Sequence, residues 1–322
     1  MGMLSARRRI PLAAAVVLAT ATAGLATTGA SALAAASRAG GEVKPTVVLV
    51  HGAFADASGW NAVGERLLDQ GYKVVAPPNP LRGLSNDATY IASVLKKIDG
   101  PIVLAGHSYG GAVITQAAAG NPNVKALVYV SAFMPDAGES PAELSMKFPG
   151  SALGPALNPV PYTDGTGSGT DLYIKPDMFH SVFAADLPAS QTRLMAVEQR
   201  PVSQAGFGEK ATAAAWKTIP SWSIVSKQDK AIAPDLERFE ARRAKSRTVE
   251  IDSSHVSMMS HPDVVTRQIR DAATSAATGG KPAALADTGS RTQQLAGAGA
   301  VAALLVATGT AVTLTSRRHT RP

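Results

Sequence analysis

The chain has 322 residues, a formal net charge of +7 and no cysteine, which excludes disulfides, thiolate metal sites and a cysteine nucleophile. Residues 41–273 hold 22 basic and 23 acidic side chains. The positive charge therefore comes from the two ends, and we expect no binding of nucleic acid. Residues 41–273 are enough for one domain with a complete core.

The first 40 residues have the pattern of a signal peptide. Arginines at 7–9 precede an apolar stretch from Ile10 to Leu25, and small residues with A-x-A sites follow. This order is typical of an exported protein, and we expect cleavage between about residues 32 and 40. The alternative is an uncleaved anchor helix.

Short apolar runs alternate with amphipathic stretches along the predicted domain. The predicted strands are 46–50, 73–76, 102–105, 125–130, 221–226 and 248–251. The predicted helices are 60–69, 87–98, 112–119, 234–245 and 262–272. This alternation predicts an α/β fold, a doubly wound and mainly parallel sheet of about six strands. Functional residues of such a sheet lie beyond the carboxyl ends of its strands.

One interval, about residues 133–220, breaks the alternation. It is rich in Pro, Gly and Ser and shows no clear strand, and it is too long for a simple loop. We therefore predict an inserted helical cap. The large apolar side chains of this interval predict an apolar pocket. These side chains are Phe148, Met178, Phe179, Phe183 and Met195.

The strongest chemical signal is Gly106-His107-Ser108-Tyr109-Gly110, between a predicted strand and a predicted helix. G-x-S-x-G in this context is typical of a nucleophile elbow, in which glycines allow a sharp turn that projects the serine hydroxyl. Ser108 is therefore the candidate nucleophile. The backbone N–H of Tyr109 is one candidate oxyanion donor, and the N–H of Ala53, after the first strand, is the other. We expect His51 to brace that loop.

The chain order nucleophile, acid, histidine then ranks the other candidates. Asp229 follows the strand 221–226 and is the candidate acid, with Asp136 as the alternative. His255 follows the last predicted strand and is the candidate general base, whereas Asp252 lies too near it in sequence to orient its ring. We expect His107 to be structural, His261 to begin the last helix, and His180 to be packed or solvated, with a place in the pocket as the alternative.

These motifs resemble the plant methylesterase and hydroxynitrile lyase branch of α/β-hydrolases over about residues 44–272. The shared features are 48–53 (VLVHGA), Trp60, 106–111 (GHSYGG), Asp229 and His255. The pattern is also similar to that of secreted actinobacterial hydrolases. The lyases of the branch carry a Lys after the catalytic His, where this chain has Val256, and this difference favours ester hydrolysis.

The resemblance implies a serine esterase that acts through an acyl-enzyme, with no metal and no cofactor. The apolar composition of the cap predicts that its substrates are small to medium uncharged esters. Two kinds of alternative stay open. One is a cofactor-free lyase, thioesterase or perhydrolase on the same fold, and the other is a surface-displayed binding protein that retains the triad.

The C-terminal region carries three elements in order: 285–289 (LADTG), an apolar run over 295–315, and arginines at 317, 318 and 321. They resemble a Gram-positive cell-wall sorting signal of the LAxTG type. The resemblance implies that a sortase cuts between Thr288 and Gly289 and links the chain to peptidoglycan, after the apolar run has paused in the membrane. The alternative is a plain membrane anchor. Residues 274–284 are the predicted flexible linker.

Overall fold

The computed structural model describes residues 44–165 and 167–277. The predicted signal peptide, most of the linker and the sorting signal lie outside these residues. Among the described residues, no helix is both long enough and apolar enough to span a bilayer.

The centre of the fold is a six-stranded sheet with the order β2-β1-β3-β4-β8-β9. Every neighbouring pair in it is parallel, which confirms the predicted α/β architecture. Residues of β1, β3 and β8 are buried along their whole length, as expected of strands covered on both faces. The strands are β1 Thr46–Val50, β2 Val74–Val75, β3 Ile102–His107, β4 Val124–Val130, β8 Ser221–Ser226 and β9 Arg247–Ile251.

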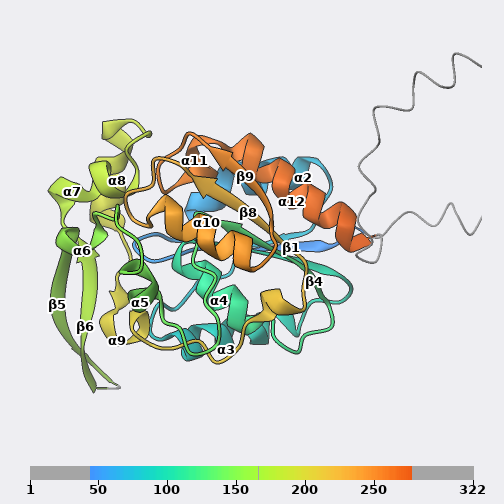
Figure 1. The fold of residues 1–322 in the computed structure, drawn as a ribbon, viewed down its shortest axis with the longest axis horizontal. Helices are drawn as coiled ribbons and strands as arrows, with labels where there is room; N and C mark the ends of the chain where they lie inside the picture. The colour runs from blue at the N-terminus through green and yellow to red at the C-terminus, as the bar shows by residue number, and fades with distance from the viewer. Residues whose placement is uncertain (1–43, 166, 278–322) are drawn as a thin grey trace, which may run out of the picture. The chain divides into compact units, whose positions relative to one another are not determined.

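Helices cover both faces of this sheet (Figure 1). The helices α2 (Asn61–Asp69) and α12 (Pro262–Ala277) pack together on one face, and α3 (Leu84–Leu95) and α4 (Tyr109–Ala117) pack together on the other. Short helices η1 (Ala57–Trp60) and α11 (Ser257–Ser260) precede α2 and α12, and α10 (Pro234–Arg243) packs against β8. The apolar side chains of both layers form the core against the sheet, while α12 continues into the predicted linker.

The segment between β4 and β8 carries helices, as predicted, and also strands that the sequence did not predict. Strands β5, β6 and β7 form a separate antiparallel sheet, and the β5–β6 hairpin extends from the side of the molecule that carries α7 and α8 (Figure 1). The elements are α5 Pro141–Ser145, α6 Leu153–Ala156, β5 Leu157–Asp164, β6 Gly167–Ile174, α7 Pro176–Phe183, α8 Ala189–Glu198, β7 Val202–Ser203, α9 Gln204–Phe207 and η2 Ala215–Lys217.

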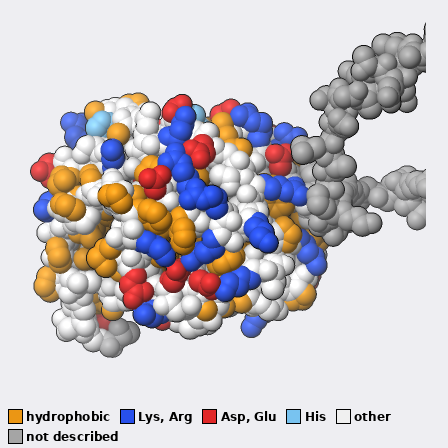
Figure 2. Space-filling view, viewed as in Figure 1, with side chains coloured by type: hydrophobic (Ala, Val, Ile, Leu, Met, Phe, Trp, Pro, Cys, Tyr) orange, Lys and Arg blue, Asp and Glu red, His pale blue; other side chains and the backbone are white. Residues whose placement is uncertain are grey.

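Hydrophobic side chains also gather on the surface at this end of the molecule (Figure 2). Leu194 and Val197 of α8 are 57% and 74% exposed, and Val160 of β5 is also exposed. Strand β5 is exposed on both faces and holds Pro159 and Pro161. It therefore lacks the alternation of apolar and polar residues by which half-buried strands are recognised.

Candidate active site

Ser108 occupies a sharp turn between β3 and α4. Its φ of 55° and ψ of −126° are unusual for a residue with a side chain. The turn closes tightly, because a Cβ on Gly106 would lie 2.6 Å from the carbonyl oxygen of Gly110, and a Cβ on Gly110 would lie 2.6 Å from that of Val50. Only glycine fits at these two positions, and the packing around the turn holds Ser108 in its strained conformation.

The structure brings together Ser108, His255 and Asp229 from three loops at the carboxyl end of the sheet. The Nε2 atom of His255 lies 2.8 Å from the Oγ of Ser108, and its Nδ1 atom lies 2.5 Å from the Oδ2 of Asp229. All three side chains are buried, with Ser108 6% exposed. In this arrangement Nδ1–H donates to the carboxylate and Nε2 can accept the proton of the serine hydroxyl.

The carboxylate of Asp229 is fixed by the backbone of its own loop. Its Oδ1 accepts hydrogen bonds from the N–H groups of Ala231 at 2.7 Å and Ile232 at 2.9 Å. Together with the Nδ1–H of His255, these donors hold the carboxylate in one orientation toward the imidazole.

Tyr109, one predicted oxyanion donor, directly follows Ser108, and the loop of Ala53, the other, packs against the serine through Gly52. Tyr109 is the first residue of α4, and a Cβ on Gly52, next to Ala53, would lie 3.2 Å from the Tyr109 nitrogen. Neither the Ala53 nor the Tyr109 N–H donates a hydrogen bond to any other group in the described part of the chain. Both are therefore able to donate to an oxygen that approaches Ser108.

His51 contacts the loop that carries Ala53. Its Nε2 accepts a hydrogen bond from the N–H of Asn79 at 2.9 Å, and its Nδ1 donates to the carbonyl of Gly52 at 2.9 Å. The side chain of Asn79 donates in turn to the carbonyl of His51. Burial lowers the pKa of His51, in keeping with a neutral ring that accepts at Nε2. The ring holds the loop and does not contact Ser108.

His107, the second residue of the G-x-S-x-G motif, contacts the backbone and the ring of the candidate base His255. Its Nε2 donates to the carbonyl oxygen of His255 at 3.0 Å, and the two ring centroids lie 4.7 Å apart. Burial and the neighbouring His255 lower the pKa of His107 well below its usual value, so this ring is neutral.

The remaining candidates from the sequence make other contacts. Asp136 pairs with Lys217 at 2.5 Å, and the exposed Asp252 pairs with Lys227 at 2.9 Å. The Nδ1 of His180 lies 3.1 Å from the hydroxyl of Thr192, within the segment between β4 and β8. His261 immediately precedes α12, which begins at Pro262, and its ring contacts Ser260.

Sequence reasoning missed Asp186, which joins the segment between β4 and β8 to the loop of His255. Its carboxylate accepts hydrogen bonds from the N–H of Ser254 at 2.9 Å, from the hydroxyl of Ser254, and from the hydroxyl of Ser253 at 3.1 Å. Burial alone would raise the pKa of Asp186, but these hydrogen bonds hold it below its usual value. A lone Asp before Leu187 and Pro188 carries no sequence signal for this role.

Aromatic side chains from the same segment and from the loop after β1 pack around His255. The ring of Phe183 lies 4.9 Å from that of His255, and the ring of Phe54 lies 6.1 Å from that of Phe183. Phe179 stacks on Phe183, whereas Phe148 packs on Phe239 of α10. The imidazole of His255 is therefore buried among aromatic side chains.

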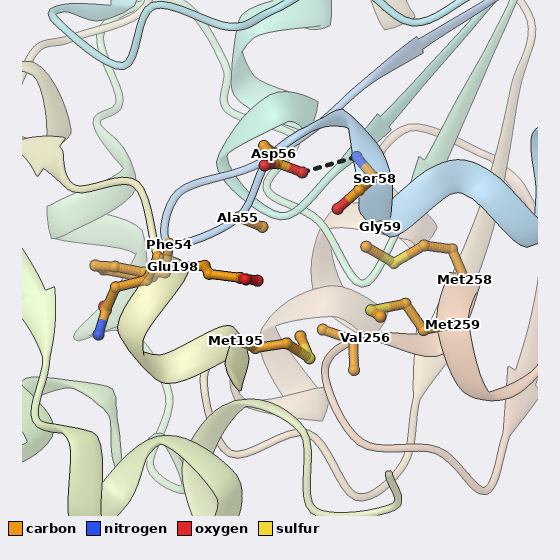
Figure 3. A pocket seen from close by; sticks show the side chains of 11 residues that line it. Phe54, Ala55, Asp56, Ser58, Gly59, Met195, Glu198, Val256, Met258 and Met259 are labelled. Atoms are coloured by element: carbon orange, nitrogen blue, oxygen red, sulfur yellow. Dashed lines mark hydrogen bonds between the residues drawn. The ribbon is translucent and has the colours of Figure 1, made fainter. Parts of the chain in front are cut away.

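A pocket lies between the loops that carry Ala53 and His255 and helix α8 (Figure 3). It is lined by Phe54 and Val256, the residues that follow Ala53 and His255, and by Met195, Met258 and Met259. In Figure 3 Met195 of α8 faces Met258 and Met259 across this space. Carboxylates of Asp56 and Glu198 also line it. Flexible thioethers suit apolar groups of varied shape.

The sequence matches known proteins over most of the described domain. The profile of the alpha/beta hydrolase family matches residues 47–268. Methylesterase 2 of Arabidopsis thaliana is 28% identical over 226 residues, which cover 61% of this chain and 82% of that protein. The carbendazim hydrolyzing esterase of Nocardioides sp. (strain SG-4G) is 34% identical over 133 residues, which cover 34% of this chain and 55% of that protein.

Among solved structures, polyneuridine aldehyde esterase superposes with a TM-score of 0.59 and 21% sequence identity. The match covers 71% of this chain and 98% of that chain. At this identity the likeness establishes the shared fold.

Proposed function

The chain belongs to the alpha/beta hydrolase family and is an enzyme, a carboxylic ester hydrolase. On this premise we propose that Ser108 is its nucleophile, that His255 is its general base and that Asp229 is the acid that orients His255. The observation that carries the proposal is the continuous hydrogen-bonded chain from the Ser108 hydroxyl through both nitrogens of His255 to Asp229. This is the arrangement that activates a serine hydroxyl.

The proposed reaction has two steps. In the first, Ser108 Oγ attacks the ester carbonyl while His255 Nε2 takes the hydroxyl proton, and the imidazolium then gives this proton to the leaving alcohol. The N–H groups of Ala53 and Tyr109 stabilise the oxyanion. In the second step His255 takes a proton from water, the resulting attack releases the acid, and Ser108 regains its proton.

We extend the proposal to the class of substrate, small to medium uncharged esters. The support is the pocket of Figure 3, which the neighbours of Ala53 and His255 in the chain help to line and whose methionines, Phe54 and Val256 offer apolar surface. The carboxylates of Asp56 and Glu198 in the same lining would repel an anionic ester. The esterase names of the relatives agree with ester hydrolysis.

Substitution of the proposed triad tests the assignment. Ser108→Ala and His255→Ala should each lower kcat/KM for a neutral p-nitrophenyl ester by at least about 10³-fold, with an unchanged melting temperature. Asp136→Asn is the matched control at the alternative acid, and it should keep wild-type activity. Retention of more than a tenth of the activity by purified Ser108→Ala would refute the proposed nucleophile.

We also propose that the enzyme is exported and linked to the cell wall at Thr288. The support is the order of the LADTG motif, the apolar run and the final arginines, which all lie outside the described residues. A covalent wall link survives boiling in SDS and yields to muramidase. Thr288→Ala should move the enzyme to the membrane or medium, and release of the intact wild-type chain by detergent alone would contradict wall attachment.

A further inference from the structure

A second carboxyl group lies behind Asp229. Glu237 is in the first half of α10, and its side chain is 2% exposed. Its Oε2 accepts a hydrogen bond from the N–H of Ser226, at the end of β8, at 3.2 Å. The N–H of Asp229 donates to the carbonyl oxygen of the same Ser226 at 3.1 Å, so one backbone residue joins the loop of Asp229 to the Glu237 carboxyl group. Both carboxyl groups are buried and both residues bond Ser226, which places Glu237 close to the loop of Asp229.

Two neighbouring buried carboxyl groups cannot both stay ionised without strong repulsion, so one of them holds a proton. Asp229 accepts three hydrogen bonds, from Ala231, Ile232 and His255. Glu237 accepts only the one from Ser226, and its Oε1 accepts none from the rest of the described chain. Because hydrogen-bond donors stabilise the ionised form, Asp229 keeps the charge and Glu237 keeps the proton.

The charged surroundings of Glu237 agree with this distribution. Burial, and next the negative charge of Asp229, raise the pKa of Glu237 well above its usual value. The other titratable group that acts on it is Glu240, one turn along α10, whose own pKa burial raises to about 8. Glu240 accepts a hydrogen bond from the N–H of Met134 and lies near Arg243, so its own contacts are with residues outside the proposed triad.

We infer that Glu237 is a positioning residue of the proposed triad: as a neutral carboxylic acid it donates a hydrogen bond to the carboxylate of Asp229, and this bond holds Asp229 ionised and aimed at His255. The inference rests on the proposed function of the triad. An acid in this position also reduces the electron density on Asp229, and this effect keeps the imidazole of His255 from holding its proton too tightly.

Two near-isosteric substitutions separate this role from simple packing. Glu237→Gln keeps a neutral donor for Asp229 and an acceptor for Ser226, so it should retain kcat/KM within about two-fold and keep the pH profile. Glu237→Leu removes both. It should lower kcat/KM at pH 7 by about ten-fold, the effect of one lost hydrogen bond to a charged group.

The pH profile provides the readout that packing alone would not change. Without its donor, Asp229 becomes more basic and favours protonated His255, so the acid limb of kcat/KM in Glu237→Leu should move to higher pH by about 0.5 or more. Glu240→Gln, a buried carboxyl on the same helix, is the matched control and should leave the acid limb unchanged. A lower melting temperature for Glu237→Leu with an unmoved acid limb would overturn the inference.

The proton itself can be observed without any substrate. Infrared difference spectra between wild type and Glu237→Gln at pH 7 should contain the carbonyl stretch of one protonated carboxyl group, distinct from the one removed by Glu240→Gln. Absence of that band, or a Glu237→Gln enzyme as impaired as Glu237→Leu, would overturn the inference. Failure to hydrolyse any ester would instead contradict the proposed function and leave the infrared result standing.

Discussion

Gly52→Ala places a methyl group between the oxyanion loop and the nucleophile. Its Cβ would lie 2.6 Å from the Cβ of Ser108 and 2.7 Å from the carbonyl oxygen of His107. Ordinary van der Waals contact begins at 3.4 Å, so the loop and the elbow must separate by about 0.8 Å. The neighbouring atoms belong to the backbone or lie next to it, and they cannot move aside as the end of a flexible side chain can.

The separation should act on catalysis more than on folding. Displacement of reacting groups by about 1 Å costs about 10²-fold in rate, and the forced packing costs about 1–3 kcal/mol of stability. We therefore expect Gly52→Ala to lower kcat for a neutral p-nitrophenyl ester by about 10²-fold. Its melting temperature should fall by about 3–10 °C.

A second glycine provides the control. Gly64 lies inside α2, and a Cβ there would meet no atom within 4 Å. Gly64→Ala should therefore keep wild-type kcat and gain about 0.5–1 kcal/mol of stability, because alanine favours the helix. Steady-state kinetics and thermal melts on both variants provide the comparison. A Gly52→Ala enzyme with kcat within about three-fold of wild type would refute the reasoning on the oxyanion loop.

Three further outcomes are expected. Asp229→Asn should lower kcat/KM by as much as His255→Ala does or by less, and KM should stay nearly unchanged. The substitution alters the orientation and charge of His255 and leaves the pocket intact. Asp186→Asn should lower kcat a few-fold and, with allowance for the solvent exposure of this carboxylate, stability by about 1 kcal/mol. Because the pKa of Asp186 is lower in the folded state, its stabilisation of the fold is complete above the unfolded pKa near 4 and is lost as pH falls through the folded pKa. Chemical denaturation across this range should therefore show that the free energy of unfolding falls less with acid in Asp186→Asn than in wild type. The kcat/KM for a neutral ester should be at least about ten-fold higher than that for an anionic ester of equal size, and a reversed preference would contradict an apolar substrate pocket.

The parts of the fold that the sequence predicted depend on strong local patterns. Val47 to Val50 are buried on both faces of the sheet, so their run is continuously apolar and easily recognised. Gly106 and Gly110 are required by backbone contacts on either side of Ser108, so the elbow is visible as a motif. Asp229 and His255 follow the strands β8 and β9, whose ends the sequence also marks.

The missed features depend on contacts between distant residues. Glu237 has the sequence pattern of a charged residue on an exposed helix, and only the packing of α10 against β8 turns it toward Asp229. Asp186 accepts a hydrogen bond from Ser254, which lies 68 residues further along the chain. Strand β5 contains prolines and is stabilised by pairing with β6, which local periodicity does not reveal.

The central claim is that Ser108 is the residue activated by this site. Incubation of the purified wild-type domain with a fluorophosphonate, followed by proteolysis and mass spectrometry, tests it directly because the reagent forms a stable adduct with an activated serine hydroxyl. We predict a single adduct on Ser108, formed in step with the loss of esterase activity and abolished in His255→Ala. Full inactivation with the adduct on another residue, or an active enzyme that the reagent never labels at Ser108, would contradict the account.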